Sequence, residues 1–88
     1  MKKIFGYNKT TTKANQELIK QELKENTEQR FYQEFNIFNL GEDTIHIRLN
    51  GGNWIELEAG EGFSTQHKVY KCEVQEAGAI VKYSGVGK

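Results

Sequence analysis

The chain has 88 residues, twelve basic and twelve acidic side chains, and a formal net charge of zero. This length allows one domain at most. The balanced charge argues against a nucleic-acid-binding protein, which normally presents a strongly basic face. No apolar run approaches the roughly 20 residues that span a bilayer, so no membrane partner is expected.

Stability is the next constraint, because a domain this small buries little apolar surface. The single cysteine excludes an internal disulfide and fits synthesis in a cytoplasm. With only two histidines beside that cysteine, we expect no metal and no cofactor. Assembly with its own copies or with a larger partner remains as a source of support.

Residues 1–30 differ in composition from residues 31–88, and we interpret them as a polar N-terminal arm ahead of an antiparallel β domain. Within residues 1–12, the apolar Ile4, Phe5 and Tyr7 precede a run of threonines. Such a segment is either a peptide that docks on another molecule or a frayed terminus.

Residues 13–30 contain good helix formers and neither Gly nor Pro, which predicts a helix. Its apolar stripe is narrow and includes Leu18, Ile19 and Leu23. A helix of this length is marginal alone in water and needs a surface to lie on. That surface is either one end of the β domain or a neighbouring subunit, and a disordered tail is the third alternative.

From residue 31 the apolar pattern has the two-residue period of β-strands, interrupted by glycine-rich turns. Short strands joined by tight turns indicate a small antiparallel β-sandwich or barrel of five to six strands. The expected strands cover residues 31–40, 44–50, 54–58, 63–65, 68–75 and 79–84.

The segment 44–58 predicts a hairpin with a register that can be checked. A three-residue loop, Gly51-Gly52-Asn53, places apolar residues opposite apolar residues. In that register Ile47 lies opposite Leu57 in the core. Arg48 lies opposite Glu56 on an exposed face, and His46 lies opposite Glu58.

Catalysis would require a nucleophile with a base and an orienting group. Cys72 alternates with apolar neighbours and is interpreted as a core residue, while His67 lies in a polar loop. The carboxylates fall on a predicted solvated face, which does not shift their acidity as acid–base catalysis needs. We therefore expect no catalytic residue and no enzymatic activity.

Trp54 is predicted on the exposed face, beside Arg48, His46 and Glu56, and forms a candidate binding surface with them. A large aromatic near an arginine is a common contact anchor. The alternative is that the N-terminal helix covers the indole. The candidate contacts of the arm are listed here: Ile4, Phe5, Tyr7, Leu18, Ile19 and Leu23.

The run from Asn39 to Phe63 combines an Asn-Leu-Gly turn, a strand, an Asn-Gly-Gly hairpin, a second strand and Gly-Glu-Gly-Phe. With the later segment 79–85, AIVKYSG, it resembles the small β-sandwich modules of tailed-bacteriophage and prophage virion proteins. The similarity covers residues 35–85. It implies a virion protein without active site or cofactor, made in the host cytoplasm, that binds its own copies and a larger capsid or tail scaffold.

The leading functional hypothesis is therefore a non-enzymatic phage or prophage structural or accessory protein, such as a capsid-decoration component, that self-associates. The first alternative is a carbohydrate-binding module that uses Trp54. The second is a small phage-encoded inhibitor of a host protein, which would likewise present a protein-binding surface.

Overall fold

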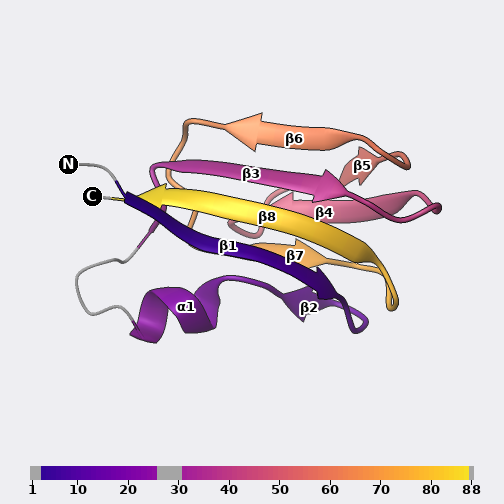
Figure 1. Cartoon of the computed structure of the whole chain (residues 1–88), viewed down its shortest axis with the longest axis horizontal. Coiled ribbons are helices and arrows are strands. Elements are labelled where there is room, and N and C mark those ends of the chain that lie inside the picture. The colour runs from indigo at the N-terminus through magenta and orange to yellow at the C-terminus, as the bar shows by residue number, and fades with distance from the viewer. Residues whose placement is uncertain (1–2, 26–30, 88) are drawn as a thin grey trace.

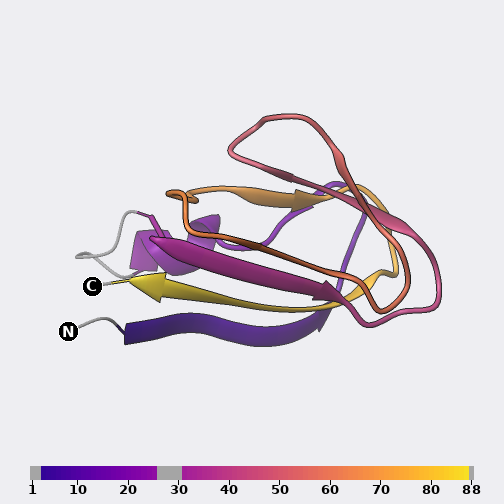
Figure 2. The same cartoon turned by 90° about the horizontal axis from the view of Figure 1, so that it is seen from above.

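The computed structural model describes residues 3–25 and 31–87. Within this part of the chain, the elements are β1 (Lys3–Thr11), β2 (Gln16–Glu17), α1 (Lys20–Glu25), β3 (Glu34–Asn39), β4 (Ile45–Leu49), β5 (Ile55–Leu57), β6 (Gly62–Thr65), β7 (Cys72–Val74) and β8 (Ile80–Gly87). The strands form two antiparallel sheets in the orders β1-β8-β3-β6 and β2-β7-β4-β5 (Figures 1 and 2). The predicted mainly β antiparallel sandwich is confirmed.

The core lies between the two sheets, which we call sheet A (β1-β8-β3-β6) and sheet B (β2-β7-β4-β5). Alternating residues of β3 and β8 are buried, and the rings of Phe35 and Tyr83 lie 6.1 Å apart. From sheet B, Ile45 and Ile47 are buried against them. The six strands expected within residues 31–88 correspond to β3–β8.

The N-terminal arm differs from the sequence-based expectation, because residues 3–11 form an edge strand of sheet A. β1 pairs with β8, Thr10 lying opposite Val81, and the register shifts between Phe5 and Asn8. The threonines of this segment are good strand formers, as are the aromatic residues before them. The backbone of Ile4, Phe5 and Tyr7 belongs to β1, while their side chains lie outside the described residues.

The predicted helix over residues 13–30 is wrong for its first seven residues. Asn15 adopts a φ of 53°, which breaks a helix, and Gln16–Glu17 pairs with β7 instead. Strand pairing thus overrides the helix propensity of this segment. Only Lys20–Glu25 is helical among the described residues, and residues 26–30 lie outside them.

The apolar stripe of this segment is buried inside its own molecule. Leu18, Ile19 and Leu23 belong to the core cluster of the sandwich. The hydroxyl of Tyr83 also donates a hydrogen bond of 3.2 Å to the carbonyl of Leu18. These three residues are therefore not contacts to a neighbouring subunit, and the arm is part of the β domain.

The predicted hairpin register is wrong by two residues, although the buried phase is right. Ile47 lies opposite Ile55, and His46 lies opposite Glu56. The turn is formed by Asn50 and Gly51, with φ values of 56° and 71°, and Gly52 N–H donates to the carbonyl of Leu49 at 3.0 Å. This is the Asn-Gly turn that suits the twist of a hairpin.

The turn is preferred because Asn50 is anchored. Its side-chain amide donates to the carbonyl of Lys68 at 2.8 Å, and its oxygen accepts from Tyr70 N–H at 2.9 Å. Beyond Ile47, β4 therefore continues along β7, with Arg48 opposite Glu73. Arg48 does not lie opposite Glu56, and Ile47 does not lie opposite Leu57.

At one end of the sandwich the chain crosses between the sheets four times, through residues 12–15, 40–44, 58–61 and 75–79 (Figure 1). Two crossovers meet at Asn39, which is fully buried. Its Nδ2 donates to the carbonyls of Asp43 at 2.8 Å and Leu57 at 3.1 Å, and its Oδ1 accepts from Gly41 N–H at 3.0 Å.

The other two crossovers meet at Thr12. Its hydroxyl donates to the carbonyl of Glu76 at 2.7 Å and accepts from Ala79 N–H at 3.2 Å. Its backbone bonds with Ala79 and Gly78. A buried polar residue thus joins each pair of crossovers through its side chain and its backbone together. Among the described residues no buried side-chain N or O atom lacks a partner.

At the other end of the sandwich, the ring of Tyr32 packs closely on the backbone of Gly85 in β8. A Cβ atom added at Gly85 would lie 2.3 Å from Cγ of Tyr32, a buried ring that stacks on Phe35 at 6.2 Å. β8 therefore needs glycine at this position so that Tyr32 can close the core.

Gly85→Ala should destabilise the protein by about 1–3 kcal/mol, because the methyl group has no room against a buried ring. In a domain of this size, each kcal/mol lowers Tm by roughly 4–8 °C, which calorimetry would resolve. Gly41→Ala is the matched control, since its Cβ would lie 3.5 Å from the nearest atom, Oδ1 of Asn39. Equal Tm values for the two variants would contradict this packing.

Candidate functional site

The four residues predicted to form an exposed binding surface do lie together on the outer face of sheet B. The Arg48 guanidinium lies over the Trp54 ring at 4.5 Å from its centroid. His46 Nε2 lies 3.8 Å from a carboxylate oxygen of Glu56, its cross-strand neighbour. Trp54 is half-buried, and the side chain over it is Arg48 rather than the N-terminal helix.

Arg48 is committed to a carboxylate of its own molecule. Its Nε and Nη2 donate to the two oxygens of Glu73 at 2.9 and 3.0 Å. Glu73 is only 8% exposed, and the hydrogen bond from Arg48, with the nearby charges of Arg48 and Lys71, lowers its pKa against the opposing effect of burial. This two-point ion pair stabilises the pairing of β4 with β7.

His46 is held in the same way, by Glu76 rather than by Glu58. One carboxylate oxygen of Glu76 accepts from His46 N–H at 2.7 Å, and the other lies 2.7 Å from His46 Nδ1. Burial acts to raise the pKa of Glu76, but the hydrogen bonds from the side chain and backbone of His46 lower it overall. Glu76 thereby joins the beginning of β4 to the crossover formed by residues 75–79.

A carboxylate–imidazole pair could orient a general base if a nucleophile lay within reach. Cys72 lies on the inner face of the neighbouring strand β7, is fully buried, and has its pKa raised by burial and by Glu17 and Glu73. Its predicted place in the core is confirmed. Among residues 3–25 and 31–87, no group of three or more His, Cys, Asp or Glu residues could hold a metal ion.

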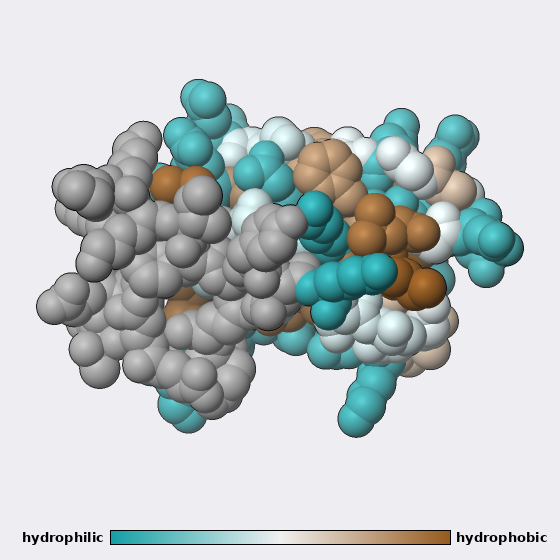
Figure 3. Space-filling model, viewed as in Figure 1, coloured by the Kyte–Doolittle hydropathy of each residue, from teal (hydrophilic) through white to brown (hydrophobic). Residues whose placement is uncertain are grey.

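The outer face of sheet A carries an apolar patch that the sequence reading did not single out. Phe38, Leu40 and Ile80 are 43%, 45% and 37% exposed. Leu40 N–H donates to the carbonyl of Ile80, so β3 and β8 place the three side chains on one face. Figure 3 shows apolar surface gathered near the end of the molecule where β8 begins.

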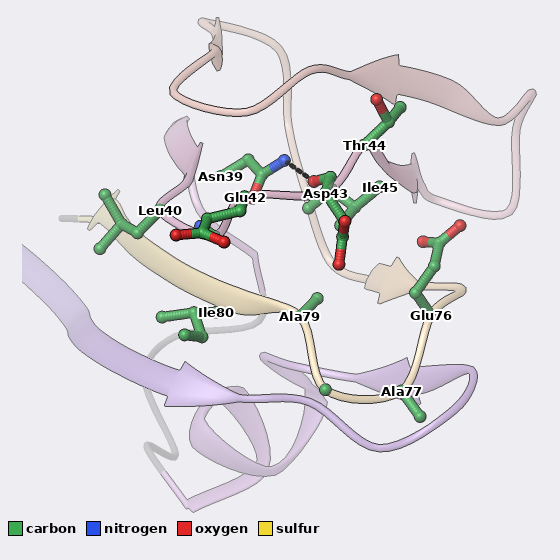
Figure 4. A pocket seen from close by; sticks show the side chains of 12 residues that line it. Asn39, Leu40, Glu42, Asp43, Thr44, Ile45, Glu76, Ala77, Ala79 and Ile80 are labelled. Carbon is green, nitrogen blue, oxygen red and sulfur yellow. Dashed lines mark hydrogen bonds between the residues drawn. The ribbon is translucent and has the colours of Figure 1, made fainter.

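A pocket adjoins this patch at the crossover end, between residues 39–45 and 76–80 (Figure 4). Leu40 and Ile80 belong to both the pocket and the patch, while Glu42, Asp43 and Glu76 supply carboxylates to the lining. The carboxylate of Glu76 is already bonded to His46. The pocket therefore extends the patch with an acidic border.

A signal for the patch was present in the sequence. In the segment 31–40, apolar residues occupy both phases of the strand, Phe35 and Ile37 in one and Phe38 and Leu40 in the other. The first pair is buried and the second exposed. The partners of the polar face, Glu73 and Glu76, left no such signal, because they pair with residues 25 and 30 positions away.

Comparison with protein-family models, with curated protein sequences and with solved structures found no match. Within the part of the chain that the structure describes, no helix is both long and apolar enough to cross a bilayer.

Arg48→Met should lower the free energy of unfolding at pH 7, since it removes two charge-assisted bonds to the carboxylate of Glu73. The depressed pKa of Glu73 stabilises the fold above the carboxyl's ordinary value of 4.5, and this contribution is lost as the pH falls through the lower folded value. The difference in free energy of unfolding between Arg48→Met and wild type should therefore become smaller below about pH 4.5.

Urea titrations at pH 7 and pH 3 measure both effects. Glu56→Gln is the matched control, because Glu56 is exposed and 3.8 Å from His46, and exposed pairs contribute roughly 0–1 kcal/mol. If the difference in free energy of unfolding between Arg48→Met and wild type were the same at both pH values, the lowered pKa of Glu73 would not be due to Arg48.

Proposed function

We propose that this protein is a non-enzymatic binding module that docks on a larger protein through the outer face of sheet A. The observation that carries the proposal is the contiguous exposure of Phe38, Leu40 and Ile80. Large apolar side chains clustered on the surface of a small domain mark interaction sites, whereas single ones need no explanation. The acidic border at Glu42 and Asp43 supplies the polar rim that such interfaces have.

The larger partner that we propose is a virion scaffold, a capsid or tail of a tailed bacteriophage or prophage. This part of the proposal rests on the resemblance of residues 35–85 to virion β-sandwich modules. One feature of the fold supports it, because the exposed Phe38, Leu40 and Ile80 give the outer face of sheet A an apolar surface suited to contact with a larger protein.

The carbohydrate-binding alternative centres on Trp54 and has less support. A sugar stacks on an open aromatic face, and the Arg48 guanidinium lies over this ring. Arg48 is in turn held by Glu73. Saccharide binding at this position would therefore have to displace a cation–π contact and strain a two-point ion pair.

Co-sedimentation with particles purified from the phage or lysogen that encodes the chain tests the proposal. We expect saturable binding of wild type, and at least a tenfold weaker affinity for Leu40→Ser and Ile80→Ser, because each removes apolar area from the centre of the patch. Tyr70→Ser is the matched control, since Tyr70 is 54% exposed and lies outside the patch.

Absence of binding to these particles would overturn the virion role. Equal affinities for the patch variants and Tyr70→Ser would overturn the docking face. A host protein that binds instead, with the same sensitivity to Leu40→Ser, would keep the docking face and favour the inhibitor alternative, which loss of that protein's activity on binding would then test.

A further inference from the structure

We propose that β6 pairs with β6 of a second copy of this chain, antiparallel and around a twofold axis, so that sheet A continues across a dimer. Among the strands formed by residues 3–25 and 31–87, β6 is one of four that lie at the edge of a sheet. Edge strands present unpaired backbone groups, and soluble proteins usually protect them with bulges, charges, proline or very short length.

The other three edges are protected. β2 and β5 have two and three residues. β1 is long, but its register shifts between Phe5 and Asn8. β6 has four regularly paired residues, GFST, without a charge, a proline or a bulge. It lies at the open upper margin of sheet A in Figure 1.

The hydrogen bonds of β3 show which backbone groups of β6 are free to pair. Asn39 N–H donates to the carbonyl of Glu61, so this pair is hydrogen-bonded. In an antiparallel ladder, hydrogen-bonded pairs recur at every second residue. Phe63 and Thr65 therefore direct their backbone groups to β3, and the exposed Gly62 and Ser64 direct theirs outward.

The side chains restrict the register of such a pair. Phe63 packs against the core and Ser64 is exposed, so residues with the same orientation must lie opposite each other. A twofold axis at Ser64 satisfies this condition, because Ser64 then lies opposite the partner's Ser64 and Gly62 opposite the partner's Gln66. The outward groups at these positions bond across the axis.

Charge complementarity favours a second copy as the occupant. β6 is preceded by the exposed Glu58 and Glu61 and followed by the exposed His67 and Lys68. Antiparallel pairing places the acidic end of one strand beside the basic end of the other, twice per dimer. In the register centred on Ser64, Glu61 lies opposite the partner's His67.

The dimer surface is separate from the docking face. Phe38 adjoins β6, since its ring lies where a Cβ of Gly62 would be, but Ser64 lies opposite Asn36, whereas Leu40 and Ile80 lie at the crossover end, just after β3 and at the start of β8. The dimer therefore does not require the virion role. The co-sedimentation test can therefore disprove particle binding without disproving the dimer, and the cross-linking test can disprove the dimer without disproving particle binding.

Cross-linking of Ser64→Cys tests the register directly. Hydrogen-bonded antiparallel pairs have Cα atoms about 5.5 Å apart, within the roughly 4.4–6.8 Å that a disulfide spans. Gln66→Cys is the matched control, because two Gln66 residues would lie four positions apart along the strand, out of disulfide range. The native Cys72 is buried and does not compete.

Under mild oxidation we expect Ser64→Cys to form a covalent dimer at least tenfold faster than Gln66→Cys. Light scattering of the wild type should show a mass above the 10.1 kDa of one chain as concentration rises toward about 1 mM, since so small an interface binds weakly. Ser64→Pro removes an outward N–H only, so it should stay folded by circular dichroism and remain monomeric.

Equal cross-linking rates for the two cysteine variants, or a wild type that stays monomeric up to about 1 mM, would overturn the β6 dimer. If Ser64→Pro does not fold, Ser64→Lys replaces it, because a lysine on each side of the axis opposes pairing by charge. A folded Ser64→Lys variant that dimerises as well as wild type would also overturn the dimer.

Discussion

The buried amide of Asn39 is the interaction on which the arrangement of the two sheets depends. It ends β3 in sheet A, and its side chain donates to the carbonyl of Leu57 in sheet B and to that of Asp43 in the crossover between them. Its backbone accepts from Gly60 N–H and donates to Glu61. Without this side-chain amide, three backbone groups would lose their partner beside a fully buried position: the carbonyls of Asp43 and Leu57 and the N–H of Gly41.

The surfaces proposed for binding follow from the way these crossovers are held. Because Asn39 and Thr12 fix the crossover end, Leu40 and Ile80 are presented side by side at the mouth of the acidic pocket. The outer face of sheet B is different, since its charged residues bind one another. Arg48 with Glu73 and His46 with Glu76 therefore stabilise the β4–β7 pairing, and the docking face that we propose lies on the other sheet.

The sequence predicted what depends on local alternation. Ile47 and Cys72 are predicted in the core and are buried there, and the predicted strands lie near the observed positions of β3–β8. Local alternation does not predict the hairpin register, because the turn depends on Asn50. The side chain of Asn50 binds the backbone of residues 68–71, which are far along the chain.

In the N-terminal thirty residues, too, local sequence preferences do not predict the structure, because contacts with later residues decide it. Helix formers fill residues 13–19, yet the chain there turns at Asn15 and pairs with β7. The energy of a helix is local, whereas the pairing of β2 and the burial of Ile19 depend on a sheet formed mostly by later residues. The candidate site was likewise found only in part. The cluster around Trp54 was recognised, but its ion-pair partners and the apolar patch depend on tertiary contacts.

The most direct test of this account is urea unfolding of Asn39→Asp at pH 7, with Asn36→Asp as the control on the outer side of the same strand. The substitution preserves shape, so it opens no cavity, but it turns a donor that faces two carbonyls into a charged acceptor. We expect a loss of about 3–5 kcal/mol for Asn39→Asp and less than about 0.5 kcal/mol for the surface control. Equal stabilities of the two variants would contradict the claim that this amide joins the sheets.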